Sequence, residues 1–192
     1  MDYLILVNKF EPLPDIKIQL KEVRGKLFEK QTAYALEKLL KAAEKCGIDL
    51  EIVSGYRSSE YQQMLWEKEI SKEMSLGLGY IQAVKKVGQT LALPGSSEHA
   101  TGLAVDFAIQ GNDDADYNFA GSEQAVWLER NAHKYGFILR YPRLKEHLTG
   151  IAFEPWHYRY VGKESAELIK ENGICLEEFL EFYQDKYLDS TK

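Results

Sequence analysis

The pattern of apolar and polar positions predicts helices and strands interspersed along the chain. Apolar residues recur at helical spacing over residues 31–46, where Gly47 offers a C-terminal stop. Ser59 followed by Gln62 resembles a capping box that opens a second helix. Residues 103–109 alternate bulky and small side chains, which is the period of a strand. Further helices are expected over residues 122–135 and 177–187, and strands over residues 3–7, 48–53, 136–139 and 156–161.

These elements do not follow regular βαβ units, so the expected class is α+β, with a central, mainly antiparallel sheet and flanking helices. No repeat, low-complexity tract or Pro/Gly/Ser-rich linker divides the chain. The 192 residues, 45% of them apolar, are enough for one core. Residues 1–192 are therefore expected to form a single domain, with the turn-rich stretch 110–122 as a surface loop.

Charge and composition exclude several classes of partner. The formal net charge of -6 disfavours nucleic acid and anionic lipid. The apolar stretch at residues 3–7 is too short for a signal peptide, and no stretch approaches the roughly 20 apolar residues that span a bilayer. The protein is expected to be soluble and cytoplasmic. Cys46 and Cys175 match no metal-ligand spacing and are expected to be free thiols, and the pattern does not predict an oligomeric state.

Asp106 is an acid in the middle of an otherwise apolar strand. Its neighbours on the same face are Gly102, Ala104 and Ala108, which leave open space beside a carboxylate that is costly to bury without a partner. This open space suggests a cleft. His99 lies seven residues earlier, close enough along the chain to reach it. Imidazole and carboxylate are common zinc ligands, so the pair predicts part of a metal site. Taken singly, Asp106 is as well explained as a salt-bridged core acid and His99 as a structural histidine.

A catalytic zinc usually has three protein ligands and a nearby base. Glu154 and His157 provide both if Pro155 interrupts the strand and lets the two side chains converge. The spacing E-x-x-H recurs by chance and carries little weight alone. His133 and His147 are interpreted as structural or surface residues. Trp156 is interpreted equally well as a wall of the pocket or as a core aromatic.

Taken together, these residues resemble a known family. Residues 97–106 match in full the S-x-H-x-x-G-x-A-x-D motif of the zinc D-Ala-D-Ala peptidases, the VanY/VanXY-like D,D-carboxypeptidases and D,D-dipeptidases, and Glu154 with His157 matches their second motif. The resemblance extends through Ser-Gly-Tyr-Arg-Ser at 54–58 and through residues 135–142 and 154–162, in the right order. Five fixed positions in one ten-residue window are hard to obtain by accident.

The resemblance implies a role for each matching position. His99, Asp106 and His157 would bind one zinc ion in a cleft, and Glu154 would be the catalytic base. Arg57 would stabilise the developing oxyanion. In relatives, polar residues at the positions of Ser97 and Gln62 help to hold the substrate, although here Gln62 also fits the capping box and Ser97 also fits a role in shaping the loop before His99.

The implied substrate is a small peptide that ends in D-Ala-D-Ala. The resemblance favours the vancomycin-resistance type, which acts on the free dipeptide or on the C-terminal D-Ala of peptidoglycan precursor pentapeptides. Loops at residues 71–93 and 110–122 are expected to limit substrate length. The alternatives are a phage-type peptidoglycan endopeptidase and, less favoured, a non-catalytic zinc-binding module, which would have no need of Glu154 or Arg57. The motif does not distinguish antibiotic resistance from wall recycling.

Overall fold

The computed structural model describes residues 1–112 and 114–188 and confirms the α+β class. Four antiparallel strands form the central sheet in the order β3-β4-β6-β5, and a separate hairpin pairs β1 with β2. The strands are β1 (Leu20–Val23), β2 (Lys26–Glu29), β3 (Glu51–Ser54), β4 (Ala104–Ala108), β5 (Phe137–Leu139) and β6 (His157–Tyr160). The expected single domain over residues 1–192 stays a prediction, and residues 189–192 lie outside the described part.

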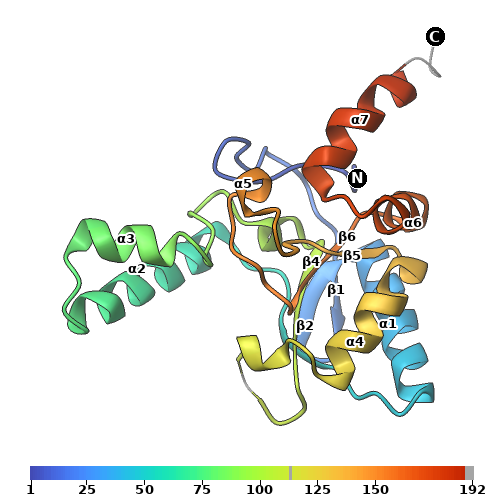
Figure 1. Ribbon diagram of the computed structural model, residues 1–192, viewed down its shortest axis with the longest axis horizontal. Helices are drawn as coiled ribbons and strands as arrows, with labels where there is room; N and C mark the ends of the chain where they lie inside the picture. The colour runs from blue at the N-terminus through green and yellow to red at the C-terminus, as the bar shows by residue number, and fades with distance from the viewer. Residues whose placement is uncertain (113, 189–192) are drawn as a thin grey trace.

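Helices surround the sheet and extend away from it (Figure 1). The α-helices are α1 (Lys30–Lys45), α2 (Ser59–Ser75), α3 (Tyr80–Val87), α4 (Glu123–Asn131), α5 (Glu146–Thr149), α6 (Lys163–Asn172) and α7 (Leu176–Leu188). Short 3₁₀ turns are η1 (Glu98–Thr101), η2 (Tyr117–Phe119) and η3 (Ala132–Tyr135). In residues 1–112 and 114–188, no helix combines the length and the apolar character needed to cross a bilayer.

The main core lies between one face of the sheet and the helices α1 and α4. Val105 and Phe107 of β4 point into it together with Tyr158 of β6. The apolar side of α1 supplies Leu36 and Leu39, both fully buried. The period-two alternation predicted for residues 103–109 and the helix predicted for residues 31–46 are thus confirmed; the strand is one residue shorter at each end, and the helix is shifted by one residue.

A second apolar cluster packs α6 and α7 against Ile138 and Val161, with Leu4 and Leu6 at its edge. The strand expected at residues 3–7 is wrong, since this segment has no strand hydrogen bonding. It is instead fixed through its carbonyls, because the Arg159 guanidinium donates hydrogen bonds to Tyr3 and Ile5 at 3.0 and 2.7 Å.

Helices α2 and α3 form a hairpin that projects from the body (Figure 1). Its own small core contains Trp66, Ile70, Ala83 and Val87. The loop expected over residues 71–93 is therefore mostly wrong, because the end of α2 and the whole of α3 lie within it. The capping box is also misplaced by one residue: Ser58, not Ser59, is the N-cap of α2 and accepts a hydrogen bond from the Tyr61 backbone.

Other predictions agree with the structure within one to three residues at their limits. The helix expected over residues 122–135 is α4 followed by η3, and the helix expected over 177–187 is α7. The loop expected over 110–122 contains only the short turn η2, apart from Asp113, which lies outside the described residues. Both cysteines are free, Cys46 exposed and Cys175 buried.

Candidate functional site

The sheet register places two of the expected ligands side by side. Asp106 of β4 pairs directly with His157, the first residue of β6. Cross-strand partners point to the same face, so both side chains lie on the face opposite Val105 and Tyr158. They are almost completely buried, with 7% and 5% of their surfaces exposed. The apolar alternation that fills the core on one side therefore presents a carboxylate and an imidazole on the other.

His99 reaches this pair from the turn η1, and Gly102 explains how. Gly102 ends the turn with a φ of 71°, and a Cβ at this position would lie 2.6 Å from the Glu29 backbone nitrogen. Only glycine fits such a position without strain. The Glu29 amide donates to the Gly102 carbonyl at 2.9 Å, which anchors the turn to the β1–β2 hairpin. Gly102, the glycine of the motif, thus allows the chain to leave η1 and enter β4.

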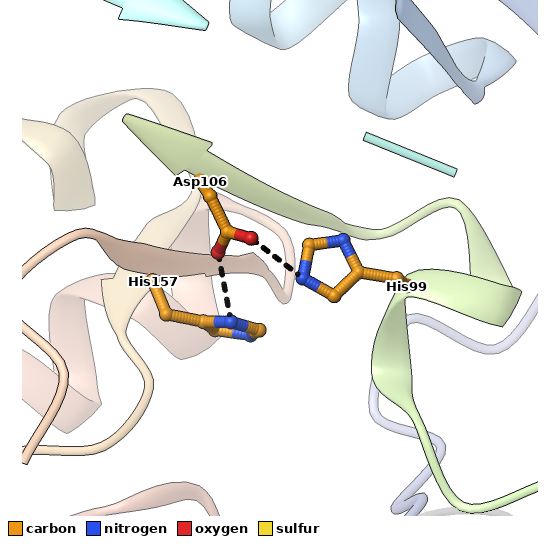
Figure 2. Close-up of side chains that lie close together, drawn as sticks. All are labelled: His99, Asp106 and His157. Atoms are coloured by element: carbon orange, nitrogen blue, oxygen red, sulfur yellow. Dashed lines mark ion pairs between the residues drawn. The ribbon is translucent and has the colours of Figure 1, made fainter. Parts of the chain in front are cut away.

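Both oxygens of Asp106 are directed at imidazole rings (Figure 2). Oδ2 lies 3.1 Å from Nε2 of His99, and Oδ1 lies 3.0 Å from Nδ1 of His157. One ligand atom from each of the three residues lies within 4.8 Å of the other two. Among the described residues, Nε2 of His99 and Oδ1 of Asp106 have no hydrogen-bond partner although they are buried. Two nitrogens and a carboxylate in this arrangement fit a zinc ion.

The second nitrogen of His99 fixes which lone pair faces the site. Nδ1 lies 2.7 Å from the Gly55 carbonyl oxygen, which can only accept a hydrogen bond. The proton is therefore on Nδ1, and the Nε2 lone pair is directed at Asp106. Burial and the nearby Arg57 guanidinium lower the pKa of His99 to about 4, so the ring is neutral near pH 7. A neutral ring is the form that binds a metal.

Asp106 and His157, the other two members of the triad, shift each other's pKa. Burial alone would raise the pKa of Asp106, but His99 and His157 hold it well below its ordinary value. Burial alone would lower the pKa of His157, but the Asp106 carboxylate raises it to about 9. The pocket thus favours a cation beside Asp106.

Glu154 approaches the triad through a turn at Pro155. The His157 amide donates to the Glu154 carbonyl at 3.3 Å, so the chain reverses over Pro155 and Trp156 before β6 begins. This brings Oε2 of Glu154 to 3.6 Å from Nδ1 of His157. The convergence expected from Pro155 is present. Burial raises the pKa of the Glu154 carboxyl to about 8, which places its protonation near neutral pH.

Arg57 also lies close to the carboxylate of Asp106. Its guanidinium is 3.6 Å from Oδ2, and its backbone amide donates to the His99 carbonyl at 3.2 Å. The Nε of Arg57 is buried without a hydrogen-bond partner among the described residues. A fixed positive charge with a free donor beside the triad suits an anion that appears during reaction.

Ser97 and Gln62 are not brought into this group. Both are buried, at 3% and 1% exposure, and neither is among the described residues that line the cleft. The amide of Gln62 donates to the Ala92 carbonyl at 2.8 Å, and Ala92 does line the cleft. Gln62 therefore supports a wall of the cleft from behind. A direct contact of either residue with substrate stays a prediction.

The cleft over the triad has a volume of about 390 Å³. Trp156 lines it and also packs against the main core, so both interpretations of this residue hold. Tyr117 makes an edge contact with Trp156 at 5.1 Å between ring centroids, so the 110–122 loop contributes to the cleft, and its effect on substrate length stays a prediction. Tyr141 and the acids Glu69 and Asp116 also line the cleft, although none of them was assigned an individual role from the sequence.

Comparison with known proteins gives a consistent family. The family model described as VanY: D-alanyl-D-alanine carboxypeptidase matches residues 25–163. A D-alanyl-D-alanine carboxypeptidase of Enterococcus faecalis (strain ATCC 700802 / V583) is 38% identical, covering 92% of this chain and 65% of the relative. The bifunctional D-Ala-D-Ala dipeptidase and carboxypeptidase VanXYC of Enterococcus gallinarum is 35% identical, covering 95% of each. The chain thus spans about two thirds of one relative and nearly all of the other.

Solved structures of related peptidases are similar to this chain in both sequence and fold. VanYB in complex with D-alanine-D-alanine is 38% identical, with a TM-score of 0.86 over 93% of this chain and 97% of that one. A VanY mutant from a VanB-type resistance cassette, in complex with Zn(II), is 37% identical, with a TM-score of 0.85 over 94% and 99%. The LD-carboxypeptidase LdcB is 38% identical, with a TM-score of 0.77 over 93% and 86%.

Proposed function

Because the chain belongs to the VanY D-alanyl-D-alanine carboxypeptidase family, we propose that it is a zinc-dependent D,D-peptidase. Its substrates are D-Ala-D-Ala as the free dipeptide and the C-terminal D-Ala of peptidoglycan precursor pentapeptides. One observation carries the proposal: His99, Asp106 and His157 present a three-ligand site, and Glu154 lies beside it in a cleft. The similarity to VanYB and VanXYC supports the substrate class.

Three residues would hold the zinc ion: His99 through Nε2, Asp106 through its carboxylate and His157 through Nδ1. The bound ion supplies Lewis-acid chemistry, polarising the scissile carbonyl and making water more acidic. The remaining chemistry belongs to the chain's own side chains.

Glu154 is proposed as the proton carrier. Its carboxyl is 3% exposed and its pKa is raised to about 8 by burial, so it exchanges a proton readily near neutral pH. It removes the proton from the attacking water and delivers it to the nitrogen of the leaving D-alanine. Arg57 faces the same space and stabilises the negative charge that develops on the carbonyl oxygen.

The size of the cleft fits a short peptide. A volume of about 390 Å³ lies at the lower end of the range for small-molecule sites, which extends over roughly 300–1,000 Å³. The aromatic residues Tyr117, Tyr141 and Trp156 line the cleft. A substrate therefore enters by its C-terminal residues, and the rest of a precursor peptide extends over the rim.

A second activity has a specific observation in its favour. LdcB, an LD-carboxypeptidase, is as similar in sequence as VanYB, at 38% identity, although its TM-score of 0.77 is lower than 0.86. The alternative substrate is therefore a tetrapeptide whose last bond joins an L-centre to D-alanine. The phage-type endopeptidase remains the third candidate, and a zinc-binding module without catalysis the fourth.

The test measures cleavage of four substrates with and without a chelator, by D-alanine release for the first three and by peptide fragments for the fourth. The substrates are free D-Ala-D-Ala, a pentapeptide ending in D-Ala-D-Ala, a tetrapeptide ending in an L,D bond, and a wall peptide that is cleaved only internally. Chelator-sensitive release from either of the first two supports the proposal. Selective cleavage of the third or fourth would replace it with the corresponding alternative.

Glu154→Gln separates catalysis from binding. It should retain one zinc ion per chain and lose turnover by roughly 10²–10⁴-fold, because only the proton transfer is removed. The control is Glu171→Gln, an exposed acid on α6. Loss of zinc from Glu154→Gln would make Glu154 a ligand, and full activity would remove it from the mechanism.

Two further expectations belong to this proposal. The chain is proposed to work as one catalytic domain, which a single cooperative melting transition would support. A cytoplasmic location stays a prediction, and cell fractionation with an antibody against the protein tests it.

A further inference from the structure

Glu98 lies next to a proposed ligand in sequence but belongs to a different part of the site. It begins η1 directly before His99, and its side chain is fully buried. It is not among the described residues that line the cleft. Its carboxylate instead lies on the far side of the His157 ring, with Oε2 at 3.7 Å from Nε2 of His157. Neither of these two atoms has a hydrogen-bond partner among the described residues.

Two buried arginines hold the other oxygen of Glu98. Oε1 lies 2.7 Å from Nε of Arg140 and 2.7 Å from a terminal nitrogen of Arg159. Both arginine side chains are fully buried. Arg140 is also paired through two hydrogen bonds with Glu177 at the start of α7, at 2.8 and 2.6 Å. Oε1 accepts a hydrogen bond from Arg140 and forms an ion pair with Arg159, and Oε2 faces the imidazole.

The remaining geometry of His157 gives this contact a consequence. Nδ1 is directed at the site, 3.0 Å from Oδ1 of Asp106 and 3.6 Å from Glu154. A histidine binds metal through one nitrogen while the other carries the proton and donates it to an outer partner. For His99 that partner is the Gly55 carbonyl at 2.7 Å. For His157 the atom in the corresponding place is Oε2 of Glu98.

We propose that Glu98 is a positioning residue for His157: its carboxylate is the hydrogen-bond acceptor for Nε2–H when the ring binds the metal, and it thereby directs the Nδ1 lone pair at the metal. The two arginines hold this carboxylate in place through Oε1. The structural alternative, in which Glu98 only neutralises Arg140 and Arg159, predicts that zinc affinity does not depend on Glu98. The inference rests on the proposed zinc site but not on the proposed substrate.

The experiment measures zinc affinity by competition with a chromophoric chelator, on the whole chain and without substrate. Glu98→Gln keeps the size of the side chain and still lets an amide oxygen face the arginines. Its NH₂ group would then face His157 and favour the tautomer with the proton on Nδ1, the wrong nitrogen. Loss of an outer partner of this kind typically weakens metal binding about 10–100-fold, and this is the expected loss.

Glu177→Gln is the matched control, because it removes one charge from the same arginine network without facing His157. It should lower the melting temperature and leave zinc affinity within about threefold. Equal losses of affinity in the two variants, or unchanged affinity in Glu98→Gln, would overturn the proposal and leave Glu98 a structural charge.

Glu98→Asp keeps the falsifiable comparison if Glu98→Gln does not fold. The shorter acid keeps its charge for the arginines but withdraws from His157, so zinc affinity should fall below that of the unchanged chain and of Glu177→Gln. An Asp variant with unchanged affinity overturns the proposal. A specific loss of zinc affinity in a chain that cleaves none of the four peptides would uphold Glu98 while the proposed function fails.

Discussion

The two faces of strand β4 are equally buried and have opposite chemistry. On one face Val105 and Phe107 are completely enclosed by the main core. On the other, Asp106 is 7% exposed and faces His157 and His99. Burial of the apolar face stabilises the fold by roughly 25 cal/mol per Å². Burial of the charged face costs free energy, and this cost is offset only by a cation next to the carboxylate. Burial alone therefore does not distinguish a core from a site.

The two faces should respond differently to substitution, and the largest effect is expected from Asp106→Asn. The amide keeps the shape but removes the charge that links the two histidines. Zinc content should fall from one ion per chain to near zero, and D-alanine release should fall to background. The control is Asp49→Asn, an exposed acid. Retained zinc in Asp106→Asn, measured by atomic emission, would contradict the assignment of this face.

Phe107→Ala should reduce stability and leave zinc binding unchanged. It leaves a cavity under α1 and should lower the free energy of unfolding by about 3–5 kcal/mol, measured by urea titration. Below its melting temperature the folded protein should still bind one zinc ion per chain. Phe10→Ala is the control, since Phe10 is 78% exposed and should change stability by about 0.5 kcal/mol or less. Loss of zinc from folded Phe107→Ala would mean that the faces are not independent.

Arg57→Lys tests the charged face without replacing a proposed zinc ligand. Lysine keeps the charge but loses the planar set of donors, so kcat should fall by about 10²–10³-fold while zinc content stays at one per chain. A rise in KM alone would assign Arg57 to substrate binding and not to the transition state.

The smallest effect concerns a buried group outside both faces. Burial raises the pKa of the Cys175 thiol to about 11, so at pH 8 roughly one thiol in a thousand is ionised. Alkylation of the native protein at pH 8 should label exposed Cys46 first and Cys175 far more slowly. The rate at Cys175 should rise with pH up to about 11. Equal rates at both residues, read by mass spectrometry, would contradict this burial.

The faces of β4 could be read from the sequence because alternation is a local property. A strand puts successive side chains on opposite sides, so Asp106 among small residues predicts a site wherever the strand lies. The apolar side of α1 and the stop at Gly47 are local in the same way. The segment at residues 3–7 has equally strand-like composition, yet its carbonyls bind the Arg159 guanidinium, which is far away in the sequence. That interaction leaves no periodic signal.

The α2–α3 hairpin shows a second limit of local reading. Residues 71–93 contain the segment Leu-Gly-Leu-Gly, and glycines at this spacing are typical of a loop. The structure uses these glycines for a short connection, and α3 then packs Ala83 and Val87 against Trp66. A helix of eight residues is stable there because its apolar side is covered by α2. Only the tertiary contact decided that outcome.

The sequence by itself determined which side chains carry the chemistry: the spacing of His99 and Asp106, the pair Glu154 and His157, and the alternation that turns them away from the core. The tertiary structure decided that these segments meet, through the register that pairs Asp106 with His157. It also decided that Glu98, at a position the motif leaves open, faces the back of His157. The physical reason is that side-chain direction follows from local backbone geometry, whereas the meeting of residues some fifty positions apart depends on how strands pair and helices pack.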